Sequence, residues 1–324
     1  MAHDGQHDLM VSTPVLENVL DLARETIEPL EILNRKALDK LRDLVTIEGK
    51  VSSPMIEANQ SAAHGVAWLA TYTESISQMV KWAENLSKDM KFGQAEQLLV
   101  QIGVGEYLGQ IVGGIMMSQG EIFRLNDIGL STLDLSDFQT QEVQELLSKG
   151  NSQEARTLLV DIMQEYSANI TVGDSGLDED LEMIREQFRK FSIDRIEPHA
   201  HEWHLKDELI PLEVISELSE LGVFGLTIPE EYGGLGLSKA SMAVVSEELS
   251  RGYIGVGSLG TRTEIAAELI LCGGTEEQKK QWLPGLASGE ILPTAVFTEP
   301  NTGSDLGALR TRAIKSENGD YQIT

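Results

Sequence analysis

A segment near the end of the sequence, residues 298–305, concentrates side chains that can bind a cofactor. It reads Thr-Glu-Pro-Asn-Thr-Gly-Ser-Asp and follows the apolar stretch Ile291–Phe297. Backbone N–H groups and the hydroxyls of Thr298 and Ser304 can donate hydrogen bonds to heteroatoms or to a pyrophosphate, and Gly303 leaves room for close approach. An ordinary strand-to-strand turn is the alternative, because Pro, Asn, Gly and Asp are also preferred turn residues. The segment by itself leaves both interpretations open.

Three histidines and the single cysteine are the other side chains with potential for chemistry. His199, His201 and His204 carry the imidazole rings that many metal sites use. Their spacing does not suit one helical face, since His199 follows Pro198, so we expect a solvated helix end without a metal. Cys272 lies among apolar residues, which favours a small core side chain over a nucleophile.

Glycine recurs between positions 103 and 114. Gly103-Val104-Gly105 followed by Gly109 has a superficial likeness to a phosphate-binding loop, but that motif needs a preceding strand, and Gly109 stands one position too late. Small residues at intervals of three and four instead allow two helices to approach closely. We therefore expect these glycines to serve helix packing.

The motifs that precede residues 298–305 make that segment more specific. In chain order they are Gly222-Val223-Phe224-Gly225, Pro229-Glu230-Glu231-Tyr232-Gly233-Gly234-Leu235-Gly236-Leu237, Glu247-Glu248-Leu249-Ser250-Arg251, Gly274-Thr275-Glu276-Glu277-Gln278-Lys279 and Leu283-Pro284-Gly285-Leu286-Ala287-Ser288-Gly289-Glu290. With residues 298–305, this ordered series resembles the acyl-CoA dehydrogenase family of flavoproteins from about Leu181 onward. Phe297 is a departure, because the family more often has a small or aliphatic residue there.

The resemblance implies an FAD cofactor and an acyl-CoA substrate. The positions that it assigns to FAD binding are Val296, Phe297, Thr298, Gly303 and Ser304. Ser304 lies between FAD and the acyl-CoA in the family, so it is also a substrate-binding candidate. The implied reaction removes the α-proton and transfers the β-hydride to the flavin. The family's catalytic carboxylate corresponds to a position beyond Thr324, so no catalytic residue is assigned.

The N-terminal extension and the segment Gly255–Ile270 narrow the expected substrate. Together they resemble the methylsuccinyl-CoA dehydrogenases of the ethylmalonyl-CoA pathway, which form mesaconyl-CoA. In the family this segment lines the far end of the acyl pocket, where Arg262 could pair with the free carboxylate of methylsuccinyl-CoA. A surface arginine that pairs with Glu264 or Glu268 is the alternative.

Partners and rival functions follow from the same resemblance. We expect an electron-transfer flavoprotein as acceptor and a homodimer or homotetramer. One rival is a dehydrogenase for isovaleryl-CoA or another branched-chain acyl-CoA. A rival of another class is a non-catalytic binding protein on the same fold, such as the DNA-associated alkylation-response flavoproteins.

Apolar periodicity predicts helices through most of the chain. In the first half the predicted helices are Val15–Leu44 with a kink at Pro29, Met55–Leu86 after a Ser53 cap and Pro54, Ala95–Leu125, and Thr140–Tyr166 with a restart after Gly150. In the second half they are Leu181–Ile196, Leu212–Leu221, Lys239–Gly252 and Ile265–Cys272. Ile291–Phe297 and Tyr321–Thr324 are predicted to be β-structure.

These elements predict an α+β fold that is mainly α. Residues 1–167 form an extra all-helical module, and the polar, acidic residues 168–180 form a linker. Residues 181–290 correspond to the family's N-terminal helical domain, and residues 291–324 to the first part of its middle β-domain. We expect the chain to be truncated at its C-terminal side, because it ends inside a predicted sheet.

Composition limits the possible partners and compartment. The 324 residues include 25 Lys+Arg and 52 Asp+Glu, for a net charge of −27. Such a field repels nucleic acids and anionic membranes. An acidic N-terminus without a following apolar run does not suit a signal peptide, and no stretch is long enough to span a bilayer. With one cysteine, these features predict a cytoplasmic protein without internal disulfides.

Overall fold

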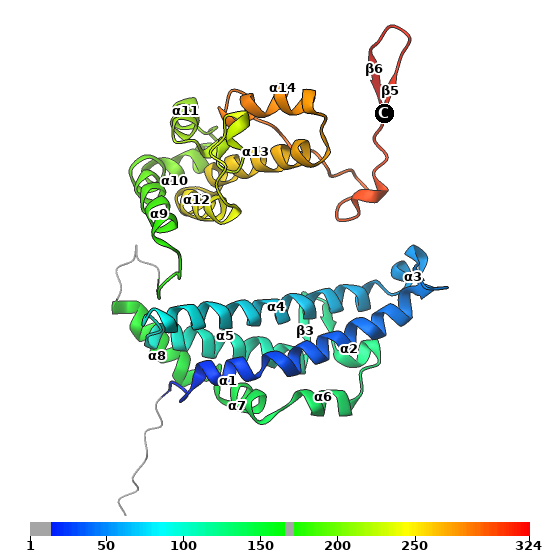
Figure 1. The fold of residues 1–324 in the computed structure, drawn as a ribbon, viewed down its shortest axis with the longest axis vertical. Helices are drawn as coiled ribbons and strands as arrows, with labels where there is room; N and C mark the ends of the chain where they lie inside the picture. Colours follow the sequence, from blue (N-terminus) through cyan, green and yellow to red (C-terminus); the bar gives the residue numbers. More distant parts are fainter. Residues whose placement is uncertain (1–13, 166–171) are drawn as a thin grey trace, which may run out of the picture. The chain divides into compact units, whose positions relative to one another are not determined.

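A computed structural model of the protein describes residues 14–165 and 172–324, and the chain divides into two compact units. The first unit is Met1–Gly176 and the second is Leu177–Thr324. Both are mainly helical, which confirms the predicted fold class (Figure 1). The expectation that residues 1–167 are all-helical is wrong, because the first unit also contains two β-hairpins. The acidic N-terminal residues and residues 166–171 of the predicted module and linker lie outside the described residues.

The first unit is a bundle built around the long helix α4, which packs against α2 and α5 (Figure 1). Its helices are α1 (Val19–Glu25), α2 (Ile27–Val45), α3 (Ser53–Ala58), α4 (Gln60–Lys88), α5 (Gln94–Gly113), η1 (Leu125–Ile128), α6 (Thr132–Phe138), α7 (Gln141–Lys149) and α8 (Gln153–Glu165). Its antiparallel hairpins pair β1 (Thr46–Ile47) with β2 (Lys50–Val51), and β3 (Ile115–Ser118) with β4 (Glu121–Phe123).

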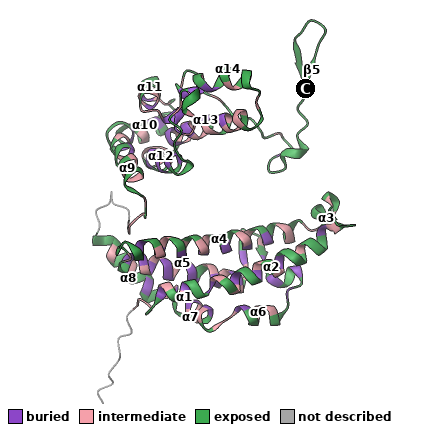
Figure 2. Cartoon of the chain, viewed as in Figure 1, coloured by how far each residue is buried: buried purple, intermediate pink, exposed green. Residues whose placement is uncertain are grey.

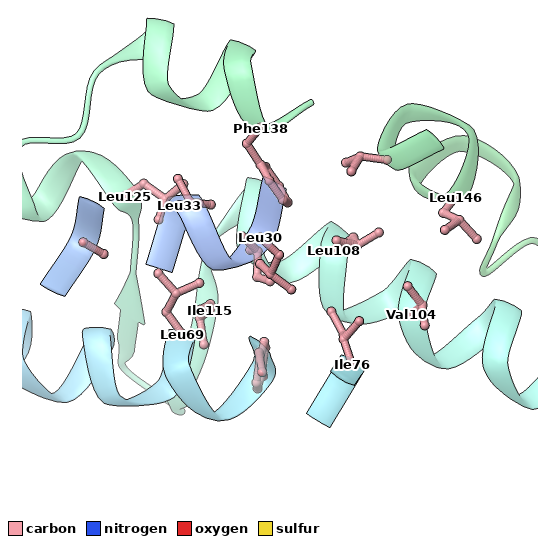
Figure 3. Packing of buried hydrophobic residues seen from close by; sticks show 14 of the residues in the cluster. Leu30, Leu33, Leu69, Ile76, Val104, Leu108, Ile115, Leu125, Phe138 and Leu146 are labelled. Atoms are coloured by element: carbon pink, nitrogen blue, oxygen red, sulfur yellow. The ribbon is translucent and has the colours of Figure 1, made fainter. Parts of the chain in front are cut away.

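Apolar side chains from several elements meet inside this bundle (Figure 3). Those fully or almost fully buried include Leu30 and Leu33 of α2, Leu69 and Ile76 of α4, Leu108 of α5, Phe138 of α6 and Leu146 of α7. Figure 2 shows buried residues on the inner faces of α2, α4 and α5 and exposed residues on their outer faces. This pattern is the amphipathic periodicity that the sequence predicted.

The predicted kink near Pro29 is a break between two helices. Proline has no N–H, and its ring clashes with the carbonyl four residues earlier, so the helix is interrupted before it. Helix α1 ends at Glu25 and α2 begins at Ile27. Between them the buried Thr26 donates a hydrogen bond from its hydroxyl to the carbonyl of Ala23 at 2.7 Å.

Other predicted boundaries lie within a few residues of the observed ones. Helix α3 begins at Ser53 with Ser52 as its N-cap, so the predicted cap at Ser53 is wrong by one position, while Pro54 lies in the first turn as predicted. The interruption after Gly150 is confirmed, because α7 ends at Lys149 and α8 begins at Gln153.

The predicted helix Ala95–Leu125 is wrong beyond Gly113. Gly114 adopts φ +128°, a conformation that side-chain-bearing residues rarely adopt, and this ends α5. The following residues form the β3–β4 hairpin, whose Phe123 packs so closely on α4 that a Cβ at Gly65 would overlap its ring. Packing against α4 therefore overrides the helical periodicity of this apolar stretch.

The second unit packs α12 between α9 and α13, with α14 on α13. Its helices are α9 (Glu179–Phe191), the π-helical η2 (Ser192–Ile196), α10 (Glu197–Lys206), α11 (Leu212–Glu220), η3 (Val223–Gly225), η4 (Glu230–Tyr232), α12 (Lys239–Gly252), α13 (Ile254–Gly273), α14 (Glu276–Ala287) and η5 (Leu306–Ala308). Helices α11 and α12 confirm the predicted ones, whereas α13 begins at Ile254 rather than at Ile265.

The β-structure of the second unit is one antiparallel pair, β5 (Ala313–Lys315) with β6 (Tyr321–Ile323), in the part of the unit that the structure describes. The strand predicted at the end of the sequence is confirmed. The strand predicted at Ile291–Phe297 is wrong, since this stretch has no regular secondary structure and pairs with no strand among the described residues. Extended backbone becomes a strand only when a neighbour takes up its N–H and C=O groups.

Residues 173–176, at the end of the first unit, contact helices α4 and α5. The carboxylate of Glu96 accepts hydrogen bonds from the backbone N–H groups of Gly93 at 2.9 Å and Asp174 at 2.8 Å. The indole of Trp82 donates to the carbonyl of Ser175 at 3.1 Å. These contacts hold residues 173–176 against the α4–α5 connection.

None of the helices in the described ranges combines the length and apolar character needed to cross a membrane.

Candidate functional site

The segment 298–305 is closed into a tight turn. The N–H of Glu299 donates to the carbonyl of Thr302 at 2.9 Å, and the N–H of Thr302 donates back to Glu299 at 3.1 Å. Thr302 is buried, and its hydroxyl donates to the carbonyl of Ala308 at 3.4 Å. The turn is therefore ordered by its own backbone and by one buried side chain.

The carboxylate of Glu299 anchors this turn to the segment after η5. It accepts hydrogen bonds from the backbone N–H of Arg310, at 3.2 and 3.0 Å to its two oxygens, and from that of Thr311 at 2.7 Å. Hydrogen bonds from the Thr311 side chain and from these two N–H groups lower the pKa of Glu299. Sequence reasoning missed this residue, and its only local signal is a carboxylate placed between Thr298 and Pro300.

The predicted cofactor-binding residues face solvent around this turn. The exposed fractions of Val296 and Phe297 are 83% and 41%, and Thr298, Gly303 and Ser304 are exposed as well. A Cβ at Gly303 would meet nothing within 4 Å. The hydroxyls of Thr298 and Ser304 make no hydrogen bond to another described residue. The turn thus presents unused donors beside an open backbone position, which is the donor set that flavin heteroatoms or a pyrophosphate require.

Arg262 lies on the exposed side of α13. The alternative in which it pairs with Glu264 or Glu268 is wrong, because Lys239 binds both carboxylates, at 3.1 and 2.8 Å. Residues two apart on a helix do not face each other, so Glu264 is out of reach of Arg262. Within the described ranges, Arg262 forms no ion pair with a carboxylate and no hydrogen bond to the turn. The structure therefore brings Thr298, Gly303 and Ser304 together in one turn, but not Arg262.

A buried ion pair explains part of the Glu247–Arg251 motif. Glu248 is 1% exposed and receives two hydrogen bonds from Arg189 of α9, from Nε at 3.1 Å and from Nη2 at 2.7 Å. Hydrogen bonding to Glu248 raises the pKa of Arg189. The pair joins α12 to α9, and sequence reasoning missed it because the two residues lie far apart in the chain.

The histidines lie on α10, where His199 stacks on Trp203 with ring centroids 5.7 Å apart. His201 and His204 line a surface cavity of about 580 Å³ with Arg251. No three His, Cys, Asp or Glu side chains in the described ranges are grouped to hold a metal ion.

Cys272 is exposed, so the expectation of a core side chain is wrong. The buried face of α13 carries Val256, Gly260, Thr263 and Ala267, whereas Cys272 follows the exposed Leu269 on the outer face.

Comparison with known proteins gives a consistent result. Residues 178–290 match the family model described as acyl-CoA dehydrogenase, N-terminal domain. The chain is 59% identical to (2S)-methylsuccinyl-CoA dehydrogenase of Cereibacter sphaeroides, over 94% of this chain and 55% of that protein. It is 40% identical to an acyl-CoA dehydrogenase of Bacillus subtilis (strain 168), over 44% of this chain and 37% of that protein.

Among solved structures, a glutaryl-CoA dehydrogenase from Mycobacterium smegmatis has 36% identity and a TM-score of 0.42, covering 46% of this chain and 38% of that one. The chain thus spans about half the length of the first of these relatives, 55%.

Proposed function

We infer the class of reaction from the acyl-CoA dehydrogenase family to which the chain belongs. We propose that the protein is an FAD-dependent oxidoreductase that converts (2S)-methylsuccinyl-CoA to mesaconyl-CoA in the ethylmalonyl-CoA pathway. The observation that carries this proposal is the 59% identity to a protein of that name. That identity extends over 94% of the chain, so it includes the helical first unit as well as the family domain.

The turn 298–305 is proposed to bind FAD. Its exposed hydroxyls at Thr298 and Ser304 would donate hydrogen bonds to the cofactor, and the open position at Gly303 would allow the cofactor to approach the backbone. Val296 and Phe297 would supply apolar contact beside these donors. Bound FAD supplies the hydride-accepting chemistry. Ser304 is proposed to contact the acyl-CoA as well.

Arg262 is proposed to select the substrate. Methylsuccinyl-CoA differs from isovaleryl-CoA by a free carboxylate, and a guanidinium can bind a carboxylate through two parallel hydrogen bonds. Arg262 is exposed and forms no ion pair in the described part of the chain, so its donors are free for a ligand. No catalytic residue is assigned within residues 1–324.

The remaining expectations are part of this proposal. The division into a helical module at 1–167, a linker at 168–180, a family domain at 181–290 and the beginning of a β-domain at 291–324 is retained. We also propose an electron-transfer flavoprotein as acceptor, a homodimer or homotetramer, and a cytoplasmic location. Support for that location comes from the net charge of −27 and the single cysteine.

The test uses the full-length gene product, mixed without oxygen with methylsuccinyl-CoA or isovaleryl-CoA while the visible flavin band is followed. We expect methylsuccinyl-CoA to bleach the flavin rapidly and isovaleryl-CoA to do so slowly. Arg262→Leu should lower kcat/KM for methylsuccinyl-CoA about 10- to 100-fold, the range of a charge-assisted hydrogen bond, and leave isovaleryl-CoA unaffected.

Arg35→Leu is the matched control, because Arg35 of α2 is exposed and forms no ion pair in the described ranges. Faster bleaching by isovaleryl-CoA would keep the family and reject the substrate. Equal losses on both substrates in Arg262→Leu would reject the role of Arg262.

A further inference from the structure

The open end of the β5–β6 hairpin is closed by hydrogen bonds between its last two paired residues. The two backbone N–H groups just before this end, those of Arg310 and Thr311, have no strand partner among the described residues. Arg312 and Thr324 exchange hydrogen bonds, each at 3.0 Å. The next N–H groups toward the N-terminus are those of Thr311 and Arg310, and no strand of the described residues lies beside them. Both N–H groups instead donate to the carboxylate of Glu299. One side chain therefore takes the place of a strand partner at this end of the hairpin.

In the described part of the chain, the carboxylate of Glu299 accepts hydrogen bonds from backbone N–H groups but forms no ion pair. Glu299 pairs with no Lys, Arg or His among the described residues. Its oxygens accept from the N–H groups of Arg310 and Thr311, and hydrogen bonds to a charged acceptor are shorter and stronger than those between neutral groups. Residues 310 and 311 stand 11 and 12 positions away in the chain. Glu299 therefore joins two segments that the local sequence does not join.

A second contact joins the same two segments. Thr302 is 7% exposed, and its hydroxyl donates to the carbonyl of Ala308 at 3.4 Å. The bridge between Glu299 and Thr302 lies between these contacts, with Thr298 just before it and Ser304 just after it. The positions of Thr298 and Ser304 thus depend on how the turn is attached to residues 308–311.

We propose that Glu299 is a positioning residue, which attaches the turn 298–305 to residues 310–311 and so holds Thr298 and Ser304 in the arrangement that binds the cofactor. This inference rests on the proposed function, because the group positioned is FAD. Glu299 itself donates nothing to a ligand, since an ionised carboxylate only accepts hydrogen bonds and both of its oxygens are already occupied.

The experiment compares Glu299→Ala and Glu299→Gln with wild type in the full-length protein. Glu299→Ala removes the acceptors, whereas Glu299→Gln keeps one carbonyl oxygen and loses the charge. Glu317→Gln is the matched control, because Glu317 lies in the exposed β5–β6 turn and makes no ion pair or hydrogen bond to a described residue. The three measurements are amide hydrogen exchange of the peptide that contains residues 308–312, the Kd of FAD, and the shape of the visible flavin band.

In Glu299→Ala we expect faster exchange at Arg310 and Thr311, a Kd for FAD raised at least about tenfold, and a flavin band shifted toward that of free FAD. Glu299→Gln should fall between wild type and Glu299→Ala, and Glu317→Gln should match wild type. A purely structural role would lower the melting temperature without this graded change in the spectrum of the flavin that remains bound.

Two results overturn the inference in distinguishable ways. If wild type binds FAD and Glu299→Ala keeps wild-type exchange and a Kd within twofold, Glu299 does not position the turn, and the proposed function stands. If wild type binds no FAD, the proposed function and the positioning role both fail, while the exchange data alone still report whether the Glu299 attachment exists. If Glu299→Ala does not fold, Glu299→Gln decides by the same criteria.

Discussion

At the scale of single residues, burial and helix geometry decide which charged side chains of the second unit form ion pairs. Glu248 is 1% exposed and is neutralised by Arg189, which reaches it from another helix. Glu264 and Glu268 share Lys239. Arg262 is left without a carboxylate in the described part of the chain, because no acidic residue stands three or four positions away from it. Arg35 likewise forms no ion pair in the described ranges, so the proposal for Arg262 rests on the comparison of its variant with that of Arg35.

The Glu248–Arg189 pair predicts a large stability effect. Glu248→Gln should lower the free energy of unfolding by about 2 kcal/mol or more, because it replaces the buried carboxylate that accepts two hydrogen bonds from Arg189 with a neutral amide that has only one acceptor oxygen. Urea unfolding measures this difference. The neighbouring Glu247 is exposed, so Glu247→Gln should change the free energy by less than about 0.5 kcal/mol. Equal midpoints for the two variants would contradict the role given to the pair.

At the scale of elements, α5 shows that similar glycines serve different purposes. A Cβ at Gly105 would lie 2.9 to 3.0 Å from backbone atoms of Asn151, Gly150 and Leu146, so this glycine allows the end of α7 to approach α5. The predicted packing role is confirmed there. It is wrong for Gly109 and Gly113, because a Cβ at either position would meet nothing within 4 Å.

This difference predicts opposite effects of the same substitution in one helix. Gly105→Ala should destabilise the protein by about 1 to 3 kcal/mol, because backbone atoms must move to admit the methyl group. Gly109→Ala should stabilise it by about 0.5 to 1 kcal/mol, because alanine restricts the unfolded chain and has open space in the fold. Thermal and urea unfolding of both variants tests the pair. Destabilisation of equal size would show that α5 does not pack as described.

At the scale of the whole molecule, the charge balance decides between classes of function. The excess of Asp+Glu over Lys+Arg is 52 against 25. A protein that binds DNA releases counterions by placing cations on phosphates, and its affinity then falls steeply with salt. The balance observed here opposes that kind of binding.

The corresponding prediction concerns the rival non-catalytic function. We expect no measurable binding of duplex DNA by the full-length protein at low salt in a fluorescence anisotropy titration, with a known DNA-binding protein as positive control. Binding that weakens linearly with the logarithm of salt concentration would favour the DNA-associated class instead. Absence of binding together with flavin bleaching by an acyl-CoA would exclude it.

Features that depend on neighbours within one helical turn were predictable from the sequence. Helix α12 was predicted with its observed bounds, and Pro29 predicted an interruption. The cap of α9 by Asp178, through the N–H of Leu181 at 2.8 Å, is an equally local signal that the prediction of a helix from Leu181 left out. Such features follow from apolar periodicity, from the missing N–H of proline, and from the four unpaired N–H groups at a helix start. The family resemblance was predictable for the same reason, because its motifs are contiguous.

Features that depend on residues far apart in the chain were decided only by the tertiary structure. The apolar residues 115–123 form a hairpin because Phe123 finds a site on α4, and Ile291–Phe297 forms no strand because no described strand pairs with it. The acceptors for the N–H groups of residues 310 and 311 come from Glu299, which no local pattern indicates. The sequence by itself therefore determined the helices, the motifs and the family, since these arise from short-range spacing. Strand pairing, the exposed side of Cys272 and the attachment of the turn required contacts that form only when distant segments meet.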